Sequence, residues 1–428
     1  MALNEISIED IQKIEPKGQD EGKALRGLPT LARWYIDTRE WDTKGLDLPL
    51  LETLRPHEQE AVKRFYHTAD KRMSLASHLL KYFYIHHVYG IPWKTIILSR
   101  TDPPQRRPYF KSSTANKIEF NVSHQASLTI LAGTVEPDGL QLQKLAAAHI
   151  PGERPQVGID ITCVNERKPI TTYAALIEHV DIFSEVFSMR ELDTMKKPQL
   201  VLSQAQKLGY ARNFSFHRED DVVRFGLRLF YSYWALKEAY VKMTGEALLA
   251  PWLRELEFTN VIPPDPVEPL LASKSCSTPG QKIPQSPKNW GAPYTDVVVS
   301  KGLEILKSVR VELVAFESDY IVATAGNGCT VGVIPQVVQG GNPSRLGDEI
   351  RVRLSGGGVE YRRIPISSKR CLGDIDPWNL PSALDDPWLP MQEVDIDLDV
   401  RACAEGRCSH PAEGADILSA VSAIKERR

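Results

Sequence analysis

The chain has 428 residues, of which 42% are hydrophobic and 25% are charged, and its formal net charge at pH 7 is −3. This composition is typical of a globular protein with material for two medium domains, and its charge argues against a nucleic-acid binder held by a global positive field. Six widely scattered cysteines argue against a dense disulfide framework.

The chain opens on a polar segment, residues 1–28, which we expect to be flexible. It has no apolar h-region, and no stretch of about 18 apolar residues follows, so we expect neither signal peptide nor membrane span and a cytoplasmic location. A first strand is predicted at 30–39, and helical spacing of apolar residues predicts helix over most of 54–89. The stretch "IEFNVSHQASLTILAGTV" at 118–135 predicts two strands around a polar turn.

A second block with the same order of elements follows a predicted linker at 135–156. The order is strand, helices, then two strands, which are predicted at 157–164, 172–208, 226–245, 308–316 and 319–326. Because each block repeats the same order, a duplication is suspected, although no repeat is readable in the sequence. We therefore expect an N-terminal half over 29–140 and a C-terminal half over 157–330.

Two further stretches lie outside these elements. The Pro-rich stretch 262–293 predicts a disordered loop, and residues 331–428 predict a mostly disordered tail. The tail holds "DPWNLP" and "DPWLP", which fit either a docking motif or tryptophans packed onto the domain. Its "CAEGRC", with Cys403 and Cys408, is weak evidence for zinc, and two exposed thiols are the simpler interpretation.

The helical stretch "YWALKEAYVKMTGEAL" places three unlike side chains on one face. At about 100° per residue, Trp234, Glu238 and Lys242 lie within one narrow sector. A solvated i,i+4 ion pair between Glu238 and Lys242, with Trp234 in the core, is the simplest interpretation. The alternative is that Glu238 and Lys242 face a functional cleft.

Two strand motifs could supply metal and phosphate ligands. In "VGIDI", Asp160 lies near the end of a buried strand, a common place for a Mg²⁺ ligand and also for a turn-forming Asp. In "FNVSHQ", Ser123 and His124 are strand neighbours that point to opposite faces, so they are not a nucleophile and base pair. A hydroxyl and an imidazole can instead donate to phosphate.

The loop "PPQRRPY" contributes Arg106 and Arg107, whose guanidinium groups suit phosphate oxygens as well as an ordinary surface turn. No G-x-S-x-G elbow, P-loop or G-x-G-x-x-G motif is present. Together, the carboxylates, hydroxyl, imidazole and cationic groups fit a phosphate-bearing substrate held through Mg²⁺.

These motifs have the order and spacing of a known family. With "FNVSH", "GID" and "WALKEAYVK", the chain resembles the Sfp-type 4′-phosphopantetheinyl transferases over about residues 30–330. "RFYHTADKRMSLASHLL" is similar to the family's N-terminal helix and "RRP" to its preceding loop. The longer pattern, including the tail, most resembles the broad-specificity enzymes of filamentous fungi.

The resemblance implies an α+β fold in which two similar halves form a pseudo-dimer. It implies transfer of the 4′-phosphopantetheine group of coenzyme A to a serine of apo carrier proteins, with Mg²⁺, releasing adenosine 3′,5′-bisphosphate. Polyketide synthases, non-ribosomal peptide synthases and α-aminoadipate reductase are the implied carriers. We expect a monomer that binds neither nucleic acid nor membrane.

The resemblance also implies roles for residues. Asp160 and Glu238 match the Mg²⁺ ligands, and Lys242 matches the lysine at the pyrophosphate. Glu238, Lys242 and Glu191, the acid of "FSMRE", are the catalytic candidates, with Glu191 as an aid to deprotonation. Thr162 stands where many bacterial members have a third acid, so a water or the threonine hydroxyl is expected there.

The same comparison implies a coenzyme A site. Ser123 and His124 match residues at its phosphates, Arg107 a basic residue near the nucleotide, and Ser74 a small hydroxyl residue at the same end. Two other functions stay open: a non-catalytic coenzyme A or carrier-binding module, and a Mg²⁺-dependent hydrolase of the coenzyme A pyrophosphate.

Overall fold

We describe the protein from a computed structural model of the chain. The structure describes residues 31–102, 107–110, 118–147, 153–166, 169–246, 250, 252–267, 290–328, 331–332, 350–353, 359–362 and 388–408. Within these residues no helix is long and apolar enough to cross a membrane.

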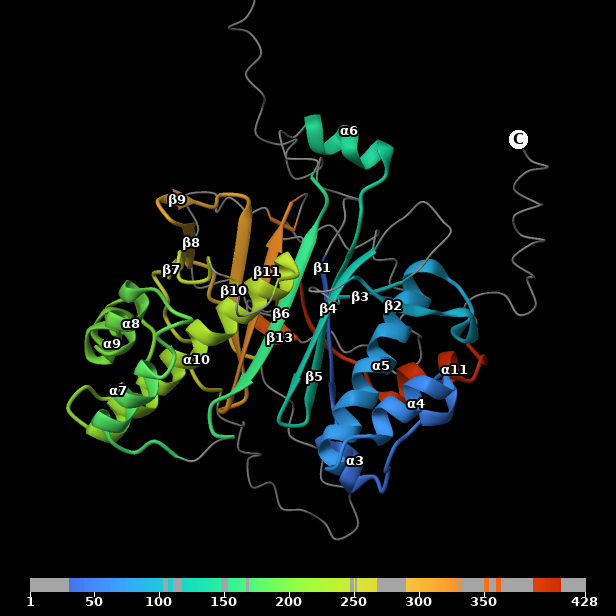
Figure 1. Cartoon of the computed structure of the whole chain (residues 1–428), viewed down its shortest axis with the longest axis horizontal. Coiled ribbons are helices and arrows are strands. Elements are labelled where there is room, and N and C mark those ends of the chain that lie inside the picture. Colours follow the sequence, from blue (N-terminus) through green and yellow to red (C-terminus); the bar gives the residue numbers. More distant parts are fainter. Residues whose placement is uncertain are drawn as a thin grey trace, which may run out of the picture.

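The N-terminal half packs its helices on one face of a sheet (Figure 1). Its elements are β1 (Leu31–Asp37), α3 (Arg39–Thr43), η1 (Leu51–Thr53), α4 (Pro56–Lys63), α5 (Thr68–Tyr89), η2 (Trp93–Thr95), β2 (Leu98–Arg100), β3 (Pro108–Phe110), β4 (Ile118–Gln125) and β5 (Leu128–Val135). The long helix α5 ends where Gly90 takes a left-handed conformation (φ 59°), which glycine adopts without strain.

The C-terminal half repeats this plan around the longest helix, α10. Its elements are β6 (Gln156–Cys163), α7 (Tyr173–Asp181), α8 (Met189–Met195), α9 (Pro198–Lys207), α10 (Glu219–Thr244), β7 (Leu256–Thr259), β8 (Val298–Lys301), β9 (Glu304–Ile305), β10 (Val309–Phe316) and β11 (Tyr320–Asn327). Like α5, α10 ends at a left-handed glycine, Gly245 (φ 81°).

The strand order identifies the two halves as structural repeats. β1-β5-β4 in the N-terminal half corresponds to β6-β11-β10 in the C-terminal half, and all these neighbours are antiparallel. In each half the long helix follows the first strand, so the predicted pseudo-dimer of two α+β halves is confirmed. The suspected duplication therefore exists in the fold, where no sequence repeat reveals it.

One buried apolar cluster joins the halves. It includes Tyr35 and Ile130 from the first sheet and Ile159, Phe316 and Val322 from the second. Because both sheets bury side chains in it, the two halves share a continuous core and pack as one body.

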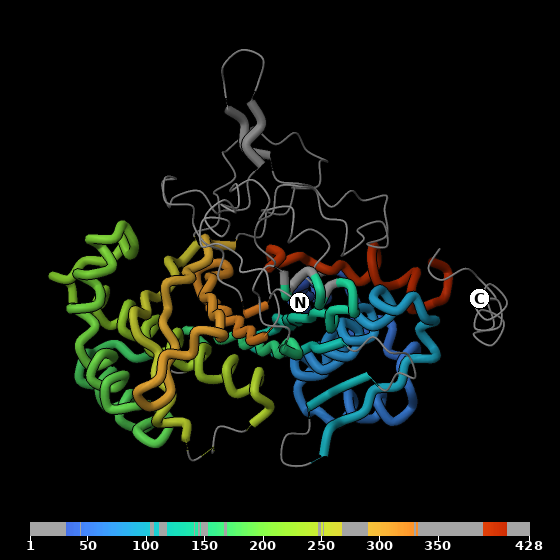
Figure 2. Tube along the Cα trace, turned by 90° about the horizontal axis from the view of Figure 1, so that it is seen from above, coloured from blue at the N-terminus to red at the C-terminus, as the bar shows by residue number. Residues whose placement is uncertain are grey.

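The structure differs from the sequence-based expectation in the tail. Residues 388–408 form β14 (Trp388–Glu393), η4 (Ile396–Val400) and α11 (Arg401–Ala404), and β14 pairs in parallel with β1. Figures 1 and 2 both show this segment beside the N-terminal half. The prediction of disorder is wrong for this segment because its apolar residues, among them Ile396 and Val400, belong to the core of the N-terminal half.

Two shorter stretches also differ. The expected linker contains a helix, α6 (Gly139–Ala147). The Pro-rich stretch is packed at its start, where Arg228 of α10 donates to the Pro264 carbonyl at 2.7 Å, and at its end, where Trp290 bridges to Phe316. A short hairpin of β12 (Ile350–Arg353) and β13 (Val359–Arg362) completes the described strands. Residues 268–289 and "DPWNLP" lie outside the described residues.

Candidate active site

The site begins with a close contact between α10 and β6. A Cβ atom on Gly158 would lie only 2.0 Å from the carbonyl oxygen of Ala239 and 2.4 Å from the amide nitrogen of Met243. Only a residue without a side chain allows the helix to approach the strand so closely. Asp160, two residues along β6, therefore lies beneath the last turns of α10.

The helix presents the stripe that its sequence predicted. Between residues 233 and 243 every side chain is buried except those of Trp234, Glu238 and Lys242, which are half-buried. Trp234 packs on the core at one end, with its ring 5.3 Å from that of Phe183. Glu238 and Lys242, the other two members of the stripe, reach the place where β4 of the N-terminal half meets β6 of the C-terminal half, which we call the seam.

At that seam three polar side chains form a closed set of hydrogen bonds. Lys242 Nζ lies 2.6 Å from Asp160 Oδ1 and donates to Ser123 Oγ at 2.8 Å. Ser123 Oγ in turn donates to Asp160 Oδ1 at 2.8 Å. Ser123 belongs to β4 and Asp160 to β6, so both halves build this cluster, and the surface-bridge interpretation fails for Lys242, which pairs with Asp160.

A residue that sequence reasoning left unassigned holds the seam together. The Asn121 side-chain oxygen accepts a hydrogen bond from the backbone nitrogen of Ile159 at 3.3 Å, and Asn121 is buried. This contact ties β4 to β6 where no backbone ladder joins the two strands. The position of Asn121 inside the motif "FNVSH" is the sequence signal that could have identified this residue.

The fourth member, Glu238, has an unusual protonation equilibrium. Burial, and secondarily the charge of Asp160, raise its pKa from 4.5 to about 7, although Lys242 opposes the shift. Two carboxylates held together in a poorly solvated place form a site that a divalent cation would stabilise. Thr162 lies two residues beyond Asp160 on β6 and is buried.

His124 and Ser74 lie toward one end of the seam. His124 pairs across the ladder with Thr129, whose hydroxyl contacts the backbone carbonyl of Met73 at 3.4 Å. Ser74, the next residue of α5, is therefore brought to the same end of β4. Loss of solvation lowers the pKa of His124, and the positive charges of Lys242 and Lys81 lower it further.

Arg107 lies toward the other end of β4, beside Glu119, so the structure does not bring Ser74 and Arg107 to the same end as expected. Arg107 already has protein partners. It forms an ion pair with Glu119 of β4 and donates to the Met243 carbonyl at 3.1 Å and the Val157 carbonyl at 3.3 Å. The arginine thus links β4 to the end of α10 and to β6. Arg106 lies outside the described residues.

Glu191 is the one predicted catalytic residue that lies apart from the cluster. Its side chain is 1% exposed and pairs with Lys237 Nζ at 2.9 Å. It also accepts from the Phe258 amide at 2.8 Å and from the Ser188 amide at 2.9 Å, which caps α8. Lys237 is fully buried, and its position in the sequence did not indicate this burial. The geometry gives Glu191 structural contacts.

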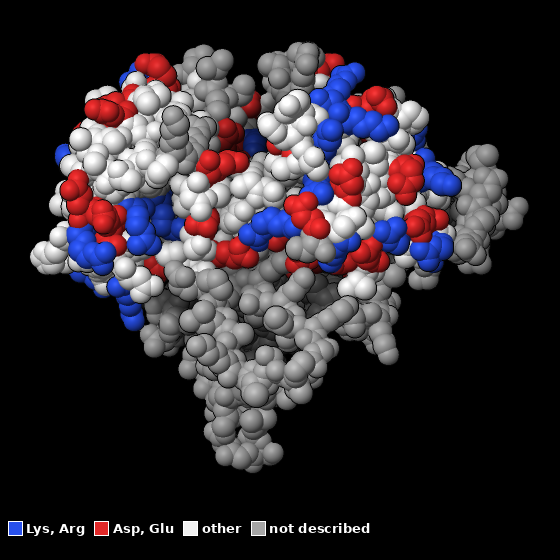
Figure 3. Space-filling view, turned by 90° about the horizontal axis from the view of Figure 1, so that it is seen from below, with Lys and Arg blue, Asp and Glu red and all other residues white. Residues whose placement is uncertain are grey.

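The face seen in Figure 3 shows where the halves meet. A notch separates them there, with acidic and basic side chains inside it, while the rest of the described surface carries both charge signs interspersed. This distribution fits the small net charge of the chain.

Comparison with known proteins assigns the family. The model of the 4′-phosphopantetheinyl transferase N-terminal region matches residues 39–136, and that of the 4′-phosphopantetheinyl transferase superfamily matches residues 156–280. The chain is 44% identical over 404 residues to 4′-phosphopantetheinyl transferase A of Aspergillus fumigatus, covering 89% of this chain and 96% of that protein. The chain belongs to the 4′-phosphopantetheinyl transferase family.

Other relatives show how widely the similarity extends. The transferase is 39% identical over 398 residues to 4′-phosphopantetheinyl transferase NpgA of Emericella nidulans, covering 89% of this chain and 96% of that protein. It is 26% identical over 218 residues to the rat L-aminoadipate-semialdehyde dehydrogenase-phosphopantetheinyl transferase, covering 50% of this chain and 54% of that protein. The predicted family, and the prediction that this is an enzyme activating carrier proteins, are confirmed.

Proposed function

We propose that the enzyme moves the 4′-phosphopantetheine group of coenzyme A to a serine of an apo carrier protein, with Mg²⁺, and releases adenosine 3′,5′-bisphosphate. One observation carries this assignment: Asp160, Glu238, Lys242 and Ser123 converge at the seam between the halves. This cluster combines carboxylates for a metal with donors for phosphate oxygens.

Asp160 and Glu238 are the proposed Mg²⁺ ligands. Their fit rests on the raised pKa of Glu238, because an added cation would offset the mutual repulsion of two poorly solvated carboxylates. When bound, Mg²⁺ would act as a Lewis acid at the pyrophosphate oxygens. We propose that the Thr162 hydroxyl or a water fills the position of a third acid.

The cationic and hydroxyl groups are the proposed coenzyme A contacts. Lys242 would exchange part of its contact with Asp160 for the pyrophosphate, where Ser123 and His124 also donate. The His124 side chain is exposed, and a ring nitrogen that carries a proton can donate to a phosphate oxygen. Ser74 would contact the coenzyme at the His124 end, and Arg107 would contribute charge near the nucleotide.

The transfer exchanges one phosphorus–oxygen bond for another. The serine Oγ of the carrier attacks the phosphorus that bears pantetheine, and the bond from that phosphorus to the bridging oxygen breaks. The electron pair leaves on adenosine 3′,5′-bisphosphate, whose developing charge Lys242 stabilises. We assign the serine proton to Glu238, which is half-buried at the site, whereas the Glu191 carboxylate is enclosed by Lys237 and two backbone amides.

The carriers are proposed by analogy with relatives. Carrier domains of polyketide synthases, non-ribosomal peptide synthases and α-aminoadipate reductase are the proposed substrates, and the name of the rat relative supports the last. Because residues from both halves of one chain build the site, a monomer is sufficient for activity.

The test is intact-mass spectrometry of an apo carrier domain after incubation with the enzyme, coenzyme A and Mg²⁺. A gain of one phosphopantetheine group, abolished by EDTA, would support the reaction and its metal. Asp160→Asn and Glu238→Gln should each lower the rate by about 100-fold or more. The matched control Glu304→Gln alters an exposed carboxylate on β9 and should leave the rate unchanged. Coenzyme A binding without transfer to several carriers would instead favour a binding module.

A further inference from the structure

We propose that His86, Cys403 and Cys408 form a zinc site that fastens the C-terminal segment to the N-terminal half. All three side chains are buried, and their ligand atoms lie within 4.8 Å of one another. His86 belongs to α5, whereas Cys403 belongs to α11 and Cys408 follows it. The ligands therefore come from two segments that are 322 residues apart at His86 and Cys408.

The histidine is already oriented as a metal ligand would be. Its Nδ1 lies 2.7 Å from the carbonyl oxygen of Ile91. A carbonyl oxygen only accepts, so Nδ1 carries the proton and Nε2 presents its lone pair. Such a hydrogen bond to a backbone carbonyl is the usual outer contact of a metal-binding histidine.

The spacing between ligand atoms fits zinc. His86 Nε2 lies 3.4 Å from Cys408 Sγ. Zinc bonds of about 2.3 Å to sulfur and about 2.0 Å to nitrogen, at a tetrahedral angle, place those two atoms about 3.5 Å apart. The pair is therefore already at the required separation, and Cys403 Sγ lies within 4.8 Å of both atoms.

The donor set selects the kind of metal. Two thiolates and an imidazole suit Zn²⁺ and do not suit Mg²⁺, which takes oxygen ligands. The two cysteines alone were weak evidence because a C-x4-C pair supplies only two ligands. The third ligand, which folding brings from α5, changes that assessment.

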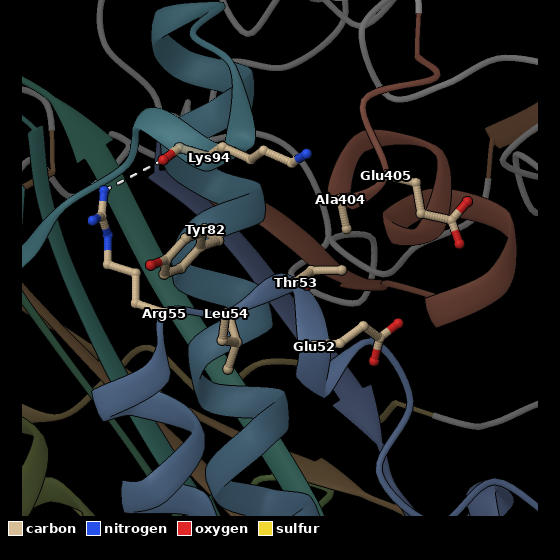
Figure 4. Close-up of a pocket in the computed structure, with 8 residues that line it drawn as sticks. All are labelled: Glu52, Thr53, Leu54, Arg55, Tyr82, Lys94, Ala404 and Glu405. Carbon is tan, nitrogen blue, oxygen red and sulfur yellow. Dashed lines mark hydrogen bonds between the residues drawn. The ribbon is translucent and has the colours of Figure 1, made fainter.

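The location indicates a structural role. Directly after Cys403, Ala404 and Glu405 form one wall of a cavity of about 460 Å³. Figure 4 shows them across the cavity from Tyr82 of α5 and from Arg55, which precedes α4. Zinc would hold this wall, and with it α11 and β14, against α5. Its predicted effect is on stability, apart from the chemistry at the seam.

Metal analysis of the full-length protein tests the proposal. Purified without added metal, the chain should hold about one zinc, and replacement by Co²⁺ should give a thiolate-to-cobalt charge-transfer absorption. Cys403→Ser and Cys408→Ser should lose the zinc and lower the melting temperature. Two controls should keep it: Cys163→Ser, which alters a buried thiol on β6, and Asp160→Asn, which alters the seam cluster.

Three results would overturn the proposal. The first is a wild-type protein that holds less than about a tenth of an equivalent of zinc, even after zinc is added and excess removed. The second is full zinc retention in both serine variants. The third is a cobalt spectrum without the thiolate band, which decides the question on wild-type protein even if the variants fail to fold.

Discussion

Glu238 holds a proton in the folded, metal-free enzyme at pH values where an exposed glutamate has released it. Its pKa is raised from 4.5 to about 7, so the folded state binds more protons than the unfolded state between these values. The contribution of Glu238 to stability must therefore fall as pH rises through this window. Mg²⁺ competes with that proton, so its affinity should rise with pH and level off above about 7.

Calorimetric titration of Mg²⁺ into the enzyme between pH 5.5 and about 8 checks this prediction. In Glu238→Gln the affinity should be weak at every pH, because no carboxylate remains to titrate at that position. A steep pH dependence that survives this substitution would assign the titrating group elsewhere. Glu304→Gln, with its exposed carboxylate, should behave as the wild type.

Glu191 and Lys237 form a buried ion pair, and a different prediction follows from it. Glu191→Gln leaves the Lys237 charge without its counterion, which typically costs about 3–5 kcal/mol of folding free energy. Urea denaturation should therefore show a large loss of stability, and the enzyme that stays folded should keep most of its kcat. A large loss of kcat at unchanged stability would restore Glu191 as a catalytic acid or base.

The sequence motifs identified the residues of the site, but they did not identify the buried lysine next to them. Asp160, Glu238 and Lys242 stand in motifs whose chemistry is readable, and the structure places them together. Lys237 is adjacent to Glu238 and looks like any surface lysine of a helix. Only the packing of α8 and β7 onto α10 encloses it, and that packing depends on contacts distant in the sequence.

At the scale of elements, the contact of α10 with β6 sets the geometry of the site. Gly158→Ala would place a methyl group 2.0 Å from the Ala239 carbonyl oxygen, so the helix must move away from the strand. Overpacking of this kind typically costs about 1–3 kcal/mol. Glu238 and Lys242 belong to α10 and would move with it away from Asp160. Transfer activity should therefore fall by a larger factor than the loss of stability alone would cause.

Thermal denaturation and initial-rate measurements on Gly158→Ala check this expectation. The matched control is Gly139→Ala, because a Cβ atom at Gly139 would contact nothing within 4 Å. The control should keep both activity and melting temperature. A fully active Gly158→Ala enzyme would show that the helix need not lie so close to the strand.

Whole-molecule arrangement was only partly readable from the sequence. The periodic patterns gave most strands and helices of both halves, because those patterns are local. No local sequence pattern predicts that β14 pairs with β1, because the paired residues Leu31 and Trp388 are far apart in the sequence. Because the sequence around this segment is polar and Gly-rich, it predicted disorder for about twenty residues that in fact fold onto the N-terminal half.

The C-terminal segment also joins the two halves. The Trp388 ring lies 4.1 Å from the Arg310 guanidinium and 5.5 Å from that of Arg33. Arg33 of β1 pairs with Glu312 of β10 and donates to the Leu389 carbonyl at 2.7 Å. One residue of the segment thus contacts charged groups from both halves, all of them buried.

Truncation tests whether the whole molecule depends on this segment. A chain ending at residue 387 loses β14, one of the two strands that pair with β1. It also loses the buried side chains of Val394, Ile396 and Val400 and exposes the core residues against which they pack. Burial of each such side chain contributes about 1.5–3 kcal/mol, and a typical domain has only about 5–15 kcal/mol in total. We therefore expect little soluble, folded protein. A chain ending at residue 408 keeps every described contact and should melt near the full-length temperature. If the shorter chain melts there too, the segment is an appendage and the two halves suffice for the fold.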